Sequence, residues 1–152
     1  MSNPFPIIEG FESLARLGGG GMGTVYLARE LGLYGFEKLC AVKLIQPNME
    51  ELTDFRAMFM DEAKLMAGMQ HPAVCQLHRF GEAEGVLYMV MEYVAGESFD
   101  SMLAKGDPPI PPLIACSMIA KVCRGLHAAH ELTDVTGAPL NVVCTAMCRH
   151  RT

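Results

Sequence analysis

The sequence predicts an α+β fold: a five-stranded antiparallel sheet with one packed helix, followed by a short helix and one long helix. Three observations lead to this prediction. Short apolar segments separated by glycine and polar turns occupy most of residues 11–94 and are typical of strands. Inside that region, residues 50–69 repeat apolar side chains every three or four positions, which indicates an amphipathic helix. The helical spacing returns in residues 113–132, so the long helix follows the sheet along the chain.

Five segments are predicted to be strands because they are rich in β-branched, aromatic and aliphatic residues and end at turn residues. The first three should form an antiparallel meander around a glycine-rich turn. A polar turn over residues 82–85 should join the last two, and the last strand is so apolar that we expect both of its faces to be buried. The predicted strands are residues 11–17, 24–30, 37–46, 74–80 and 86–94.

Three segments are predicted to be helices, residues 50–69, 98–105 and 113–132. A run rich in proline over residues 106–112 should be a stiff linker between the second and third helices. A turn then precedes a short apolar strand over residues 140–143. His127 and His130 lie on the long helix without an acidic or cysteine partner at matching spacing, so we assign them no metal.

Composition limits the possible functions. The chain has 152 residues, of which 51% are hydrophobic and 19% charged, as expected for one packed domain. A net charge of −5 argues against a surface that binds nucleic acid. The N-terminus has no basic region followed by an apolar one, and charged residues interrupt the most apolar windows. We therefore expect a cytoplasmic protein without a nucleic-acid or membrane partner.

The cysteines are scattered through apolar segments without C-x-x-C spacing. In a chain without a secretory signal this pattern favours free thiols over disulfides. We expect no disulfide among the six, which are Cys40, Cys75, Cys116, Cys123, Cys144 and Cys148.

The glycine-rich turn between the first two strands is the first candidate for chemistry. Gly18, Gly20 and Gly23 match G-x-G-x-x-G, and Val25 extends the pattern. Without side chains, the backbone N–H groups of such a turn can approach phosphate oxygens. A mobile turn without a ligand is the alternative for these residues alone.

Lys43 and Glu62 form the second candidate. Strand alternation places Lys43 on the same face as Ala41, and Glu62 interrupts the apolar stripe of the first helix, which also carries Phe59 and Met66. Because breaking a buried ion pair costs about 3–5 kcal/mol, a buried Glu62 needs a cation, and Lys43 is the natural partner. The alternatives are a lysine on an edge strand that reaches solvent and a glutamate at the wet edge of the stripe.

In this order the motifs resemble the N-terminal lobe of a protein kinase, of the Ser/Thr type that bacteria share with eukaryotes. The matching residues are Gly18-x-Gly20-x-x-Gly23-x-Val25, Ala41-Val42-Lys43, Glu62, His71-Pro72 and Tyr88-Met89-Val90-Met91-Glu92-Tyr93-Val94. The resemblance covers roughly residues 9–143, about half of a kinase domain. It implies an N-terminal extension (1–8), an N-lobe (9–95), the start of a C-lobe (96–143) and a divergent tail (144–152).

The resemblance implies a Mg-ATP site. The glycine-rich turn would cover the phosphates, and Lys43, paired to Glu62 as the catalytic Lys–Glu pair, would hold the α- and β-phosphates. Val25 and Ala41 would pack on the adenine ring, Met91 would lie at the back of the adenine pocket, and backbone groups of Glu92 and Val94 would bind the adenine edge. The implied nucleotide-binding residues are Leu17, Gly18, Gly20, Gly23, Val25, Ala41, Lys43, Met91, Glu92 and Val94.

The tail departs from the family pattern. Family members continue into the catalytic loop H-R-D-x-x-x-x-N and later into D-F-G, which supply the catalytic aspartate and the metal ligands. Residues 144–152 read CTAMCRHRT instead. One set of synonymous codons for residues 143–152, read in a shifted frame, encodes V-H-R-D-V-S-P-Q-N, so our hypothesis is a frameshift at or shortly before Cys144. The alternative is part of a metal site formed by Cys144, Cys148 and His150.

The function implied by the resemblance is the ATP-binding portion of a serine/threonine protein kinase. The family activity is phosphoryl transfer from ATP to protein Ser or Thr, and we expect this chain to be inactive alone because it lacks the catalytic loop and D-F-G. The alternative, from a different class, is a non-catalytic interaction module that binds a protein partner through the sheet and the exposed face of the long helix.

Overall fold

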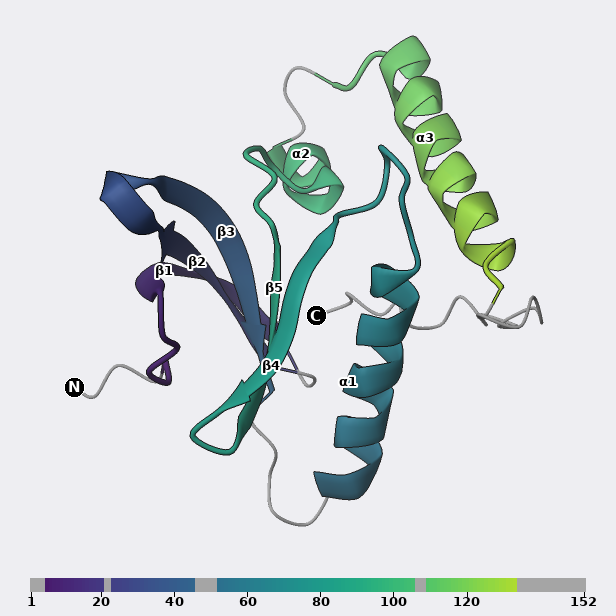
Figure 1. The fold of residues 1–152 in the computed structure, drawn as a ribbon. Coiled ribbons are helices and arrows are strands. Elements are labelled where there is room, and N and C mark those ends of the chain that lie inside the picture. Colours follow the sequence, from purple (N-terminus) through teal and green to yellow (C-terminus); the bar gives the residue numbers. More distant parts are fainter. Residues whose placement is uncertain (1–4, 21–22, 46–51, 106–108, 134–152) are drawn as a thin grey trace.

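In the computed structural model a five-stranded antiparallel sheet carries helix α1 along one side, and helices α2 and α3 follow (Figure 1). This confirms the predicted fold class. The strands are β1 (Phe11–Gly20), β2 (Gly23–Leu31), β3 (Glu37–Leu44), β4 (Leu77–Ala83) and β5 (Val86–Glu92). The helices are α1 (Leu52–Ala67), α2 (Phe99–Lys105) and α3 (Pro112–His130), with a short 3₁₀ turn η1 (Leu33–Gly35). The residues that the structure describes are 5–20, 23–45, 52–105 and 109–133.

The sheet has the strand order β1-β2-β3-β5-β4, with every neighbouring pair antiparallel. The predicted meander of the first three strands is therefore confirmed. β3 lies in the middle of the sheet, between β2 and β5, and its last five residues, 40–44, are all buried. β5 is buried over residues 87–90, as its apolar sequence predicts. Lys43 thus belongs to the part of the sheet that is buried from solvent.

The boundaries of β4 were predicted wrongly. The sequence suggested residues 74–80, but the strand is Leu77–Ala83, and a two-residue turn of Glu84 and Gly85 joins it to β5. Both turn residues have positive φ, 52° and 77°, the conformation that fits the twist of a tight hairpin. Val74 is not in the sheet because it packs on α3. An apolar residue before a strand looks like part of that strand when the distant helix that covers it is unknown.

The sheet separates two groups of buried side chains, because successive residues of a strand point to opposite faces. On one face, the N-terminal segment that includes Phe5 and Ile8 covers Tyr26, Val42 and their neighbours. On the other face α1 packs on the sheet through buried residues of both elements, which are Ile45, Phe59, Ala63, Leu87 and Met89. Lys43 lies on this second face, which we call the α1 face.

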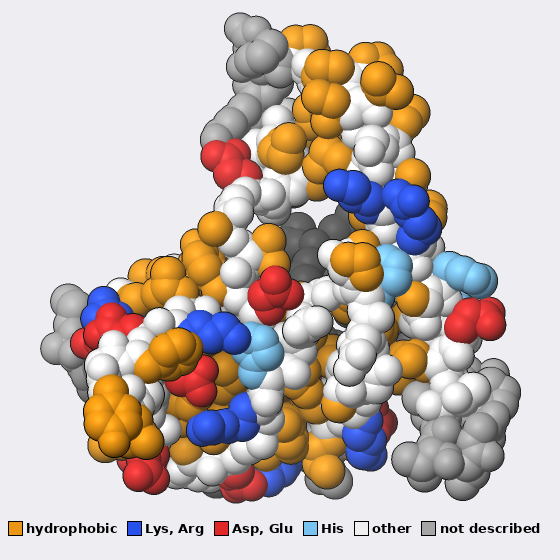
Figure 2. Space-filling view, turned by 45° about the horizontal axis from the view of Figure 1, so that its top comes forward, with side chains coloured by type: hydrophobic (Ala, Val, Ile, Leu, Met, Phe, Trp, Pro, Cys, Tyr) orange, Lys and Arg blue, Asp and Glu red, His pale blue; other side chains and the backbone are white. Residues whose placement is uncertain are grey.

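Helix α3 meets the rest of the chain near its C-terminal end. Gly125 and Ala129 are buried, and a Cβ at Gly125 would lie 3.2 Å from Val74 Cγ2, so a small residue allows the close approach. Residues 113–122 of α3 include large apolar side chains that are exposed, as the upper part of Figure 2 shows, among them Leu113 at 83% and Val122 at 53%. Among the described residues, none of the helices has the length and apolar character needed to span a membrane.

Two sequence predictions concern residues that the structure does not describe. The strand expected over residues 140–143 and the tail 144–152, with the metal-site alternative at its cysteines, lie outside the described residues. Among the described cysteines, Cys40, Cys75, Cys116 and Cys123 are free thiols, in agreement with the expectation for them.

The register of β2 on β3 predicts a sharp difference between two glycines. Gly23 has φ 142°, and a Cβ there would overlap the carbonyl oxygen of Leu44, whereas a Cβ at Gly20 would meet nothing within 4 Å. Gly23→Ala should lower the free energy of unfolding by about 1–3 kcal/mol because the backbone must shift. Gly20→Ala should change it by less than about 0.5 kcal/mol. Urea denaturation of the two variants measures the difference, and equal stabilities would contradict this register.

Candidate functional site

The candidate site is organised around the ion pair between Lys43 on β3 and Glu62 on α1. Lys43 Nζ lies 2.7 Å from both carboxylate oxygens of Glu62. Lys43 is 7% exposed, whereas the Glu62 side chain retains 26% of its exposure. The pairing predicted from the sequence is thus present, and Lys43 is not on an edge strand, since β3 has a neighbour on each side.

The surroundings of Lys43 strengthen its attraction to Glu62. The ring of Phe59, one turn before Glu62 on α1, has its centroid 5.7 Å from Lys43 Nζ, at the distance of a cation–π contact. Phe59 is 2% exposed and packs with Met89, so little water reaches this side of the ammonium group. With few competing water contacts, the ammonium group is held against Glu62.

Strand register places four of the predicted nucleotide-binding residues on this α1 face. Val25 is opposite Lys43, and Ala41 is opposite Met91. Directly opposed residues of antiparallel strands share a face, and so do alternate residues of one strand. One surface therefore carries the side chains of Val25, Ala41, Lys43 and Met91. Lys43 is the only buried cation among the described residues. The surface is apolar apart from Lys43.

The glycine-rich turn closes one end of this surface. Gly18 is opposite Val25, and Gly20 is opposite Gly23 across the β1–β2 hairpin. A Cβ at Gly18 or at Gly20 would meet nothing within 4 Å, so space is open there for a bound group. Gly23 differs, because a side chain at this position would collide with the backbone of β3. Leu17 lies at a break in the register between Arg16 and Gly18, and it is 47% exposed.

The end of β5 closes the other end. Met91 is partly buried on the α1 face, and Glu92, the last residue of β5, is exposed. Val94 follows the strand and is 66% exposed. The Glu92 N–H donates to the Gln76 carbonyl at 2.9 Å, and the Cys75 thiol donates to the Glu92 carbonyl at 3.2 Å. No sequence pattern signals these contacts, because they depend on the fold of the segment before β4.

Burial perturbs two thiols. Desolvation by burial, followed by the nearby Glu92 carboxylate, raises the pKa of the Cys75 thiol. Burial, followed by the charge of Glu30, also raises the pKa of Cys40, whose Sγ donates to the Ala28 carbonyl at 3.5 Å. Both groups are therefore protonated at neutral pH and act as hydrogen-bond donors rather than as nucleophiles.

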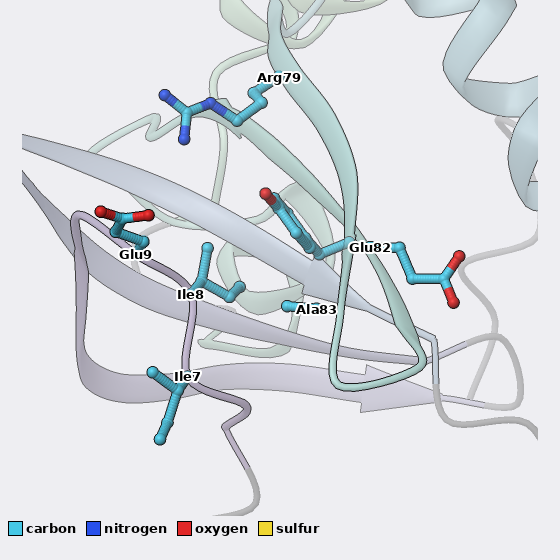
Figure 3. Close-up of a pocket in the computed structure, with 7 residues that line it drawn as sticks. Ile7, Ile8, Glu9, Arg79, Glu82 and Ala83 are labelled. Carbon is cyan, nitrogen blue, oxygen red and sulfur yellow. The ribbon is translucent and has the colours of Figure 1, made fainter.

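A separate hollow lies on the face of the sheet opposite Lys43. It has a volume of about 560 Å³ and lies between the N-terminal residues 7–9 and strand β4 (Figure 3). Tyr88, which lines it, belongs to the core group on that face, and the Ile7 N–H donates to the Glu84 carboxylate at 3.3 Å. Because it lies on the other face of the sheet, this hollow is not part of the candidate site around Lys43.

The described part of the chain holds no cluster of metal-binding side chains. No group of three or more His, Cys, Asp or Glu side chains gathers there in a metal-binding arrangement. The ammonium of Lys43, the open space at the glycines and the apolar strand residues do fit the phosphates and base of a nucleotide.

The family model described as "Protein kinase domain" matches residues 11–135. The chain therefore belongs to the protein kinase family, as the order of its motifs predicts. The curated relatives it matches include both Ser/Thr and tyrosine kinases of bacteria.

Two relatives and one solved structure show the extent of the likeness. The tyrosine-protein kinase MasK of Myxococcus xanthus is 40% identical over 131 residues, which cover 84% of this chain and 20% of MasK. The serine/threonine-protein kinase PknB of Mycolicibacterium smegmatis is 36% identical over 135 residues, covering 86% and 21%. The PknI kinase domain of Mycobacterium tuberculosis superimposes with a TM-score of 0.64 at 28% identity, covering 82% of this chain and 50% of that one. The chain thus spans about a fifth of the length of these two curated relatives.

The buried pair predicts unequal costs for two similar substitutions. Glu62→Gln leaves the buried Lys43 ammonium without its counter-ion, and because Glu62 keeps some water we expect a loss of about 1–3 kcal/mol in the free energy of unfolding. The matched control is Glu82→Gln, which removes the partner of Arg56 from a half-exposed pair at 3.0 Å. That loss should stay below about 1 kcal/mol. Urea denaturation of both variants measures the two losses. A larger loss for Glu82→Gln than for Glu62→Gln would refute the assignment of Lys43–Glu62 as the buried pair.

Proposed function

We propose that this chain binds Mg-ATP on the α1 face of its sheet, between the glycine-rich turn and the end of β5. The observation that carries the proposal is the Lys43–Glu62 pair, which fixes a buried ammonium group on the face of the sheet where Gly18 leaves open space. In this proposal Lys43 holds the α- and β-phosphates and Glu62 orients Lys43. Gly18, Gly20 and Gly23 form the turn that covers the phosphates.

The adenine base is proposed to lie on the apolar part of the same surface. Val25 and Ala41 pack on the ring together with Leu17, and Met91 lies at the back of the pocket. The Glu92 carbonyl and the Val94 N–H bind the polar edge of the base. The shared face of Val25, Ala41 and Met91 and the exposed end of β5 support these roles.

A purely structural role gives a weak reason for the pair. Removing two charges from water costs several kcal/mol, and apolar residues of similar volume are often as stable or more stable in such positions. The α1 face around Lys43 is otherwise built from apolar residues such as Ile45, Phe59 and Met89. An ammonium group in that setting is better explained by an anionic ligand than by packing.

The wider activity follows from the family. We propose phosphoryl transfer from ATP to a protein hydroxyl, specifically of Ser or Thr, as the activity to which this domain contributes, in the cytoplasm, with residues 9–143 as the partial kinase domain. The 152 residues contain neither H-R-D-x-x-x-x-N nor D-F-G, so nucleotide binding is the function proposed for the chain alone. Magnesium would arrive bound to the phosphates of ATP and neutralise part of their charge.

Nucleotide should stabilise the chain. At a ligand concentration about 100 times Kd the free energy of unfolding rises by about 2.7 kcal/mol, which raises Tm by about 5 °C or more. Thermal denaturation with and without Mg-ATP or Mg-ADP measures the shift. Lys43→Met should abolish it, whereas Glu82→Gln, which breaks the half-exposed pair with Arg56 and changes none of the proposed nucleotide-binding residues, should retain it. If neither nucleotide raises the Tm of the unmodified chain, the proposal fails.

The alternative function, a non-catalytic interaction module, has one observation in its favour. Apolar side chains over residues 113–122 of α3 are exposed, among them Leu113, Ile114, Ile119 and Val122. A protein partner that covered them would raise Tm without nucleotide, and Leu113→Ser or Val122→Ser would remove that shift. A Tm that responds to a partner but not to ATP favours this module, and the opposite response favours the nucleotide site.

A further inference from the structure

Three hydrogen bonds tie Glu92 to the segment that precedes β4. The Glu92 N–H donates to the Gln76 carbonyl at 2.9 Å, and the Gln76 N–H donates to Glu92 Oε2 at 3.4 Å. The Cys75 thiol donates to the Glu92 carbonyl oxygen at 3.2 Å, within the range for sulfur donors. The first two bonds fix where Glu92 lies. The third acts directly on the carbonyl that faces the proposed base.

We propose that Cys75 is a positioning residue that orients the Glu92 carbonyl toward the exocyclic amino group of adenine and thereby sets a preference for ATP over GTP. This inference rests on the proposed function, because it assigns the Glu92 carbonyl to the base. It adds a residue that acts through Glu92 and never touches the nucleotide.

The geometry of a carbonyl explains the effect. A carbonyl oxygen accepts two hydrogen bonds, so a thiol on one lone pair fixes the direction of the other. Adenine presents an N–H donor at its exocyclic position, whereas guanine presents an oxygen acceptor there. A fixed acceptor facing guanine leaves two acceptors opposed and unsatisfied, which discriminates more strongly than a lost contact. A carbonyl free to turn away discriminates less.

The thiol is suited to this role. It is half-buried in the segment before β4, and its raised pKa keeps the proton on Sγ at neutral pH. Cys116 and Cys123 differ because they are exposed on α3. Replacing either of them therefore provides a control for the loss of a thiol as such.

The test compares the ratio of the dissociation constants of Mg-GTP and Mg-ATP, measured by calorimetric titration of the full chain. Cys75→Val and Cys75→Ala remove the donor and should lower that ratio roughly two- to tenfold, mainly by weakening ATP, as expected for one hydrogen bond. Cys75→Ser restores a donor and should keep a ratio close to that of the unmodified chain. Cys123→Val should leave it unchanged.

The outcomes separate the two proposals. Binding of ATP by the unmodified chain with an unchanged GTP/ATP ratio in Cys75→Val and Cys75→Ala overturns the role of Cys75 and leaves the nucleotide site standing. No binding of either nucleotide overturns both. A parallel loss of ATP and GTP affinity, not restored by serine, assigns Cys75 to packing alone and also overturns the inference. Should valine prevent folding, the alanine and serine variants still give the ratio.

Discussion

The arrangement of the candidate site depends on the ion pair that joins Lys43 of β3 to Glu62 of α1. Two contacts of 2.7 Å hold the helix to the middle of the sheet. The pair requires a strand buried on both sides, a helix whose apolar stripe faces that strand, and an aromatic ring that excludes water. β2 and β5 provide the first of these, α1 the second, and Phe59 the third. The charges are tolerated because each satisfies the other.

The antiparallel register determines which residues of the neighbouring strands share a face with Lys43. Because opposed residues share a face, the row from Gly18 through Val25 and Lys43 continues to Met89, and the next row joins Ala41 to Met91. One surface therefore has the open positions of Gly18 and Gly20 at one end, a cation in the middle and an exposed strand end at the other. Nucleotides need this combination of phosphate-binding and apolar groups, and membership of the protein kinase family agrees with it.

Local sequence patterns were sufficient to predict much of the candidate site. Alternation placed Lys43 on the α1 face, and helical spacing identified Glu62 as the interruption of an apolar stripe, so the pair could be predicted. What the sequence could not provide depends on contacts between distant segments. Val74 was assigned to β4 because nothing nearby shows that α3 covers it, and the bond from Cys75 to Glu92 crosses from one segment to another. The reason for glycine at residue 23 likewise lies on β3.

In the proposed site the ammonium group of Lys43 faces the phosphates of a nucleotide. An ATP analogue that carries an acyl group on its terminal phosphate tests this directly, because it acylates an amine held beside the phosphates, and mass spectrometry of the digested chain identifies the modified lysine. We expect acylation of Lys43 that excess Mg-ATP suppresses. Exposed lysines such as Lys64 should react slowly, and at the same rate with and without ATP. Acylation of the exposed lysines alone, unaffected by Mg-ATP, would contradict this placement of Lys43.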